Sequence, residues 1–176
     1  MTTTGSDVHP RPLIILHWAM AGLIVALLAV GFLMTGADPE SATRLWLSRA
    51  HVALGVVTGV SLIARVIVRR RSAPIEPLPM SGARRALMRG VHGGIYVALF
   101  ALLASGMATS LLGDWASYVV SGTTTRAPDL HAIAPRGGHE LFAFALMGLV
   151  GVHVAGVLLH QIRLGGSLRR MLPIRK

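Results

Sequence analysis

Long apolar segments alternate with short polar stretches along the chain. A helix that crosses the hydrocarbon layer of a bilayer needs roughly 20 mostly apolar residues, because each residue adds about 1.5 Å of rise. Four segments meet this length, and Gly and Pro residues punctuate the gaps between them. The segments run at about Leu13–Met34, His51–Val68, Val91–Leu112 and Glu140–Ile162. This pattern predicts an all-α fold, a four-transmembrane-helix bundle.

Composition agrees with a membrane protein and narrows its chemistry. The 176 residues are 53% hydrophobic with a mean hydropathy of +0.62, which is more apolar than a soluble domain requires. We expect residues 1–176 to form one membrane-embedded domain, and we find no internal repeat. The first apolar run lacks a small-residue cleavage site before Asp38, so we interpret it as a retained helix. The absence of cysteine excludes disulfides, iron–sulfur clusters and thiolate haem ligands.

The formal net charge of +10 does not indicate nucleic-acid binding, because the basic residues lie at the ends of apolar runs. In a bacterial inner membrane, such residues are retained on the cytoplasmic side. We therefore expect both termini in the cytoplasm. The first and third loops hold four basic residues: Arg44, Arg49, Arg126 and Arg136. The amino terminus, second loop and tail hold thirteen: Arg11, Arg65, Arg69, Arg70, Arg71, Arg84, Arg85, Arg89, Arg163, Arg169, Arg170, Arg175 and Lys176.

The third loop, residues 113–138, is longer than a helix connection requires and contains Trp115, Tyr118 and His131. Trp and Tyr are enriched at the headgroup level of membranes, which favours an interfacial segment. The alternative is a lid over a site at the outer end of the bundle. The sequence leaves both interpretations open.

Eight histidines occur, and six of them lie in or beside the apolar segments. An ionisable side chain inside a membrane helix is costly, so it usually faces the bundle interior and has a partner. His139 and His153 are fourteen residues apart, which is about 20 Å of rise along nearly one helix face. One metal cannot bind both of them. The spacing predicts two sites stacked across the bilayer.

The predicted topology supplies a second imidazole at each level. His51 opens the second helix at the outer surface, where His139 opens the fourth. His17 lies near the inner start of the first helix, at the level that His153 approaches. Neither pair has the further ligands of a zinc site, whereas two axial imidazoles suit a six-coordinate electron-transfer haem. We predict two haem b groups, with these four histidines as iron ligands.

These positions belong to a longer set of motifs: His17-Trp18, His51-x3-Gly55-x9-Arg65-x3-Arg69, His92-x3-Tyr96, His139-Glu140, His153, His160 and a basic ending from Arg169 to Pro173. Through them the chain resembles the bacterial cytochrome b561 family of four-helix di-haem proteins over nearly its whole length. The resemblance implies axial ligands on the first and second helices and twice on the fourth, the same four positions. Leu103 is a departure, because the third helix of relatives often has a proline there.

The resemblance implies an activity as well, since superoxide-oxidising members transfer electrons to ubiquinone. Candidates for a quinone site are His92, Tyr96 and His160, which supply hydrogen bonds and protons. The alternative is that they bond only to haem propionates or backbone. Arg65 and Arg69 are candidates to pair with propionates, or else they only set topology. The four basic residues of the outer loops are candidates to steer superoxide toward the outer haem.

We therefore expect a membrane cytochrome that carries electrons from an outer-side donor, superoxide, to the ubiquinone pool. A second hypothesis is a haem-bearing membrane subunit that relays electrons for a partner dehydrogenase or hydrogenase. A third is a haem-free transporter or scaffold.

Overall fold

The computed structural model describes residues 9–73, 80–122, 126–165 and 171. Residues 74–79, a Pro-containing gap between two apolar runs, lie outside this part of the chain. So do most residues of the basic ending, among them Arg169, Arg170, Arg175 and Lys176. The helices are α1 (Arg11–Gly36), α2 (Ala42–Arg71), α3 (Gly82–Leu112), α4 (Trp115–Ser121) and α5 (Ala134–Leu164), and the described residues contain no strand. All but α4 are long and apolar enough to cross a membrane. The all-α prediction with four membrane-spanning helices is confirmed.

Two of the spanning helices begin well before their apolar segments because serine residues cap them. The Ser41 side chain accepts a hydrogen bond from the backbone N–H of Arg44 at the start of α2, and Ser81 does the same for Arg84 at the start of α3. Such caps satisfy N–H groups that have no partner inside the helix. The added turns carry Arg44 and Arg49 in α2 and Arg84, Arg85 and Arg89 in α3, and such charges favour the membrane surface over the hydrocarbon layer.

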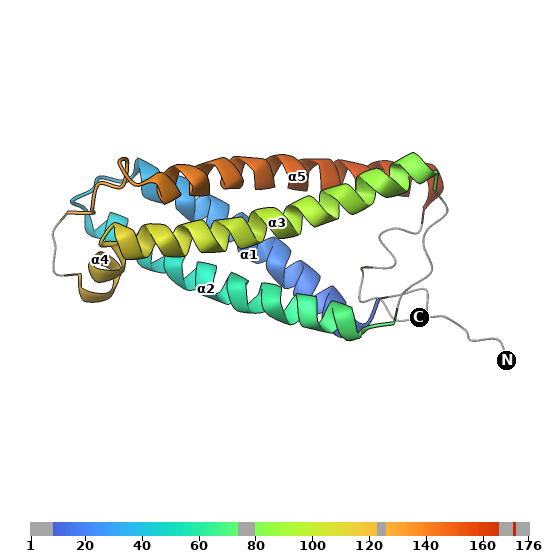
Figure 1. Ribbon diagram of the computed structural model, residues 1–176, viewed down its shortest axis with the longest axis horizontal. Helices are drawn as coiled ribbons and strands as arrows, with labels where there is room; N and C mark the ends of the chain where they lie inside the picture. The colour runs from blue at the N-terminus through green and yellow to red at the C-terminus, as the bar shows by residue number, and fades with distance from the viewer. Residues whose placement is uncertain (1–8, 74–79, 123–125, 166–170, 172–176) are drawn as a thin grey trace.

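The spanning helices are arranged as two packed pairs. α1 packs along α2 and α3 packs along α5, whereas α2 and α3 contact each other at few positions. Figure 1 shows α4 at one end of the bundle, with the start of α1 and the end of α5 at the other. Following the predicted topology, we call the α4 end the outer end and the opposite end the inner end.

A small apolar cluster closes the middle of the bundle. It contains Met20, Leu62, Ala98, Leu99 and Leu146, so every spanning helix contributes to it. Many other large apolar side chains point outward and are exposed, as expected where lipid replaces water as the solvent. α3 passes this level as one unbroken helix, because Leu103 keeps the backbone N–H that a proline would lack.

The third loop forms a cap on the outer end of the bundle. Trp115 and Tyr118 of α4 are only 4% and 3% exposed. They form a cluster with Val119 and Ala127, and this cluster packs against apolar side chains of α1 and α2, including Met34. Burial of the two aromatic side chains within protein favours the lid interpretation over an interfacial segment facing lipid headgroups.

The turn from α3 into α4 leaves no space for a side chain at Gly113. A Cβ there would overlap Leu130 and would lie 2.7 Å from Cδ1 of Ile133 and 2.9 Å from the carbonyl oxygen of Thr109. We expect Gly113→Ala to destabilise the detergent-purified protein by about 1–3 kcal/mol through overpacking, seen as a lower melting temperature. Gly137 is the matched control, because a Cβ there meets nothing within 4 Å. Equal melting temperatures for the two alanine variants would contradict this packing.

Candidate functional site

The structure brings the predicted histidine pairs together at two levels. The rings of His51 (α2) and His139 (α5) have centroids 6.1 Å apart near the outer end. The rings of His17 (α1) and His153 (α5) have centroids 6.2 Å apart toward the inner end. Two in-line metal–imidazole bonds of about 2 Å each place the ring centroids about 6 Å apart. Both pairs therefore have the separation that one iron between two imidazoles requires.

His92 is a third histidine at the inner level, but its position differs. Its ring centroid is 4.9 Å from that of His153, which is too close for an iron between the two rings. Its Nδ1 lies 2.7 Å from the carbonyl oxygen of Met88 and so carries a proton that it donates. This geometry favours His17 over His92 as the partner of His153.

Nδ1 of His139 faces hydrogen-bond acceptors on α3. It lies 3.0 Å from the carbonyl oxygen of Leu102 and 3.2 Å from Oγ of Ser105. A carbonyl can only accept, so Nδ1 carries the proton and Nε2 is left with a lone pair. This tautomer is the one in which Nε2 can bind iron, and the hydrogen bond fixes the orientation of the ring.

His51 has a closely similar setting on α1, where the backbone of Leu27 lies near its ring. A Cβ at Gly31 would lie 3.4 Å from Cε1 of His51, and a Cβ at Gly106 would lie 3.1 Å from Cε1 of His139. The glycines thus give both rings room against the neighbouring helix. Among the described residues, however, the buried Nδ1 of His51 has no hydrogen bond of normal geometry.

The matching settings come from a short sequence repeat. Residues 27–31 are Leu-Leu-Ala-Val-Gly and residues 102–106 are Leu-Leu-Ala-Ser-Gly. The first lies on α1 beside His51 and the second on α3 beside His139. This five-residue match is much shorter than the repeat of about 20–50 residues that marks a repetitive fold, so it does not contradict the expectation of no internal repeat. The two helix pairs present five-residue cradles to the outer histidines that differ at one position, Val30 in the first and Ser105 in the second.

Arg65 joins the two helix pairs at the inner level. Its Nε donates to the hydroxyl of Tyr96 on α3 at 3.1 Å, and its Nη1 donates to the carbonyl of Leu13 on α1 at 3.0 Å. Its charge lies within electrostatic range of His17 and His153. Arg65 is therefore part of the inner site and not a loop residue.

The three quinone candidates do not form one cluster. Tyr96 lies in a groove between α2 and α3 that Val66, Arg69, Arg70 and Phe100 also line. His92 is one turn away from Tyr96, on the side where it contacts His153. The side chain of His160 is only 9% exposed. It makes no hydrogen bond or ring contact with the other two candidates in the described part of the chain.

The arginines of the outer loops have structural partners. Arg44 donates to the carbonyl of Met34 and lies over the ring of Trp115, and Arg49 donates to the carbonyl of Val119 at 2.9 Å. These two hold the cap against α1 and α2. Arg136 pairs with Glu140 one turn along α5.

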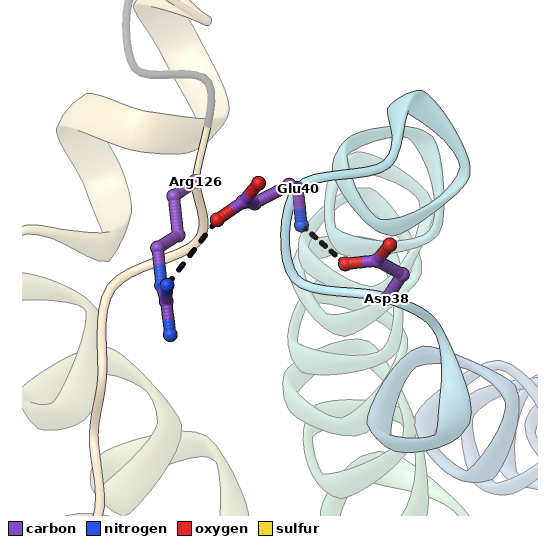
Figure 2. Close-up of polar contacts among 3 residues, drawn as sticks. All are labelled: Asp38, Glu40 and Arg126. Atoms are coloured by element: carbon purple, nitrogen blue, oxygen red, sulfur yellow. Dashed lines mark hydrogen bonds and ion pairs between the residues drawn. The ribbon is translucent and has the colours of Figure 1, made fainter.

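Arg126 is engaged at the same end of the bundle. It reaches across to Glu40 at 3.2 Å, while the backbone N–H of Glu40 donates to Asp38 (Figure 2). Only Arg126 and Arg136 are paired with carboxylates, because Arg44 and Arg49 bond to neutral carbonyls. The positive charge that could steer an anion is therefore reduced but not abolished.

The arrangement fits two haem groups on grounds of geometry. Each level offers two imidazoles at the required separation, and the two helix pairs that carry the outer ligands touch each other at few positions. No group of three or more His, Asp or Glu side chains with metal-binding geometry occurs among the described residues. We propose His17, His51, His139 and His153 as the iron ligands.

Comparison with known families shows the family of the chain. The family model described as prokaryotic cytochrome b561 matches residues 8–173. The chain therefore belongs to the prokaryotic cytochrome b561 family, whose members bind haem b, generally two, and transfer electrons in a membrane. Its general role is that of an oxidoreductase in membrane electron transfer. A comparison with curated proteins finds no match.

Single substitutions should remove the haems one at a time. We expect His51→Ala and His139→Ala to lower the haem content of the purified protein by one and to leave the same spectrum. His17→Ala and His153→Ala should remove the other haem. His92→Ala is the matched control and should keep two haems, because its ring is too close to His153 to share an iron. If His17→Ala and His139→Ala removed the same haem, the pairing would be wrong.

Proposed function

We propose that this protein oxidises superoxide at its outer end and reduces ubiquinone near its inner end. The observation that carries the proposal is the stack of two histidine pairs, about 20 Å apart along α5. Bound haem b supplies reversible one-electron chemistry at each level, so electrons can cross the bilayer. The residues hold and orient these groups, exclude water and provide protons.

The proposed reaction balances in electrons, and it needs a source of protons only for the reduction of ubiquinone. Two superoxide ions lose one electron each and leave as two molecules of oxygen. One ubiquinone gains these two electrons and takes up two protons to become ubiquinol. Superoxide oxidation itself releases no proton, so both protons must reach the quinone from the protein side or the adjacent water. Histidines at the inner end, such as His92, are suited to delivering these protons.

The groove between α2 and α3 supports a quinone site at the inner level. Val66 and Phe100 give it apolar walls, and Phe100 is exposed on the face that meets lipid. The hydroxyl of Tyr96 accepts from Arg65 and keeps its own proton available to donate to a quinone carbonyl. His92, one turn away, connects this groove with His153. His160 lies about two turns beyond His153 on α5 and is a separate candidate.

The distribution of charge supports the predicted orientation. All five acidic residues that the structure describes lie in the outer part: Asp38, Glu40, Asp114, Asp129 and Glu140. The described basic residues of the inner part number nine, against four in the outer part. Such a bias retains the basic end in the cytoplasm.

We therefore expect the carboxy terminus to face the cytoplasm, so a reporter fused to it should be active only if that reporter functions in the cytoplasm. We expect a fluorescent protein fusion to emit and an alkaline phosphatase fusion to be inactive. Active phosphatase at that position would place the basic end in the periplasm and would reverse the proposed direction of electron flow.

The activity can be tested with purified protein that holds both haems. We expect enzymatically generated superoxide to reduce the haem absorption bands, and added ubiquinone to reoxidise them. Superoxide dismutase should abolish the reduction. The variants His92→Ala and Tyr96→Phe should keep both haems and normal reduction by superoxide while slowing reoxidation by ubiquinone several-fold. His131→Ala, in the exposed outer loop, is the control.

Two outcomes would contradict the proposal. A protein with two haems that superoxide does not reduce would instead fit a subunit that relays electrons for a partner enzyme. Normal reoxidation by ubiquinone in both His92→Ala and Tyr96→Phe would move the quinone site elsewhere, with the surroundings of His160 tested next.

A further inference from the structure

The two histidine pairs have similar geometry but unequal surroundings. In the outer pair, the hydroxyl of Ser105 donates to the carbonyl of Ala101 at 2.6 Å. Its oxygen therefore presents lone pairs toward Nδ1 of His139, 3.2 Å away. The Nδ1–H of His139 is shared between this oxygen and the carbonyl of Leu102. His139 thus has two acceptors on one ring nitrogen.

Comparison of the two five-residue segments shows that His139 has a second acceptor and that His51 has no counterpart of it. Val30 stands on α1 where Ser105 stands on α3. A valine offers no lone pair to the ring of His51. Acceptors on Nδ1–H make an imidazole a more basic ligand, and a more basic ligand stabilises ferric iron relative to ferrous iron. Ser105 therefore favours the oxidised form at the outer level.

The inner pair has a positive charge beside it that no described carboxylate pairs with. His139 of the outer pair also lies near a positive charge, that of Arg136, but Arg136 is paired with Glu140. The guanidinium of Arg65 lies within range of both His17 and His153 and is fixed by hydrogen bonds to two other helices. A nearby positive charge stabilises ferrous haem, which carries one positive charge fewer than ferric haem. The described acidic residues all lie at the other end of the bundle. The inner level therefore favours the reduced form.

We propose that Ser105 and Arg65 set the direction of electron transfer, by giving the outer haem a lower reduction potential than the inner haem. The inference rests on the proposed two-haem site and deepens it, because it assigns the order of the potentials to two residues that bind no iron. Ser105 acts through His139, and Arg65 acts through its charge. Both are positioning residues for an inward, energetically downhill transfer.

The test is an optical redox titration of the purified two-haem protein, with no superoxide or quinone present. We expect two resolved midpoint potentials. Ser105→Ala should raise the lower midpoint and leave the upper one in place. Arg65→Gln should lower the upper midpoint and leave the lower one in place. Each variant therefore reduces the difference between the two midpoint potentials, one by raising the lower potential and the other by lowering the upper potential.

Conservative variants separate these effects from general loss of structure. Ser105→Thr keeps the hydroxyl and Arg65→Lys keeps the charge, so both should stay close to the wild-type midpoints. Ser110→Ala removes a hydroxyl from the same helix that makes no hydrogen bond to His139 among the described residues, so it should shift neither midpoint.

Three results would overturn the inference. The first is two bound haems with no shift in Ser105→Ala or Arg65→Gln, which would leave the proposed function standing. The second is a shift of the upper midpoint in Ser105→Ala, which would reverse the order of the two levels. The third is a single midpoint from one bound haem, which would remove the proposed function as well.

Discussion

An imidazole inside a bilayer needs a partner for each of its ring nitrogens, because lipid offers no hydrogen bonds. His139 meets this constraint, whereas Nδ1 of His51 has no hydrogen bond of normal geometry among the described residues. One nitrogen of His139 is satisfied by acceptors on α3, which leaves the other for iron. Gly31 and Gly106 let the outer rings lie close to a neighbouring helix. The packing of helices into two pairs then leaves the ligand rings facing one another at the separation that an iron requires.

The two ends of the bundle are built for different tasks. At the outer end, α4 and its flanking loop cover the helix ends. Arg49 fastens α4 through the carbonyl of Val119, while Arg44 lies over the ring of Trp115 and donates to the carbonyl of Met34 on α1. The exposed pair between Arg126 and Glu40 adds little stability, since ion pairs on the surface contribute about 0–1 kcal/mol. At the inner end, the polar contact of Arg65 with Tyr96 bridges two helices beside a groove that opens toward lipid.

The sequence allowed the spanning helices and the spatial pairing of histidines to be predicted, because both follow from periodicity and length. The starts of α2 and α3 were predicted too late, because turns capped by Ser41 and Ser81 precede the apolar runs. The helix α4 was missed because seven residues are too few to show a period. The partners of Arg44, Arg49 and Arg126 could not be predicted, because they are tertiary contacts.

The role of Ser105 needed the tertiary structure. A serine in an apolar helix normally donates to a carbonyl one turn earlier, and Ser105 does so. Its second contact, to His139 on another helix, depends on how α3 packs against α5. The signal that was present in the sequence is the five-residue repeat at 27–31 and 102–106, which becomes meaningful only once both copies are seen beside histidines.

The central claim is that each level holds one iron between two imidazoles. Low-temperature electron paramagnetic resonance of the oxidised protein tests it directly, because the spectrum reports the axial ligands of ferric haem. The imidazole planes cross at 69° in the outer pair and 70° in the inner pair. The account predicts two low-spin ferric signals of equal intensity, both with the large maximal g value of strongly crossed imidazole planes. A high-spin signal from half of the iron, or one low-spin signal at one haem per chain, would contradict it.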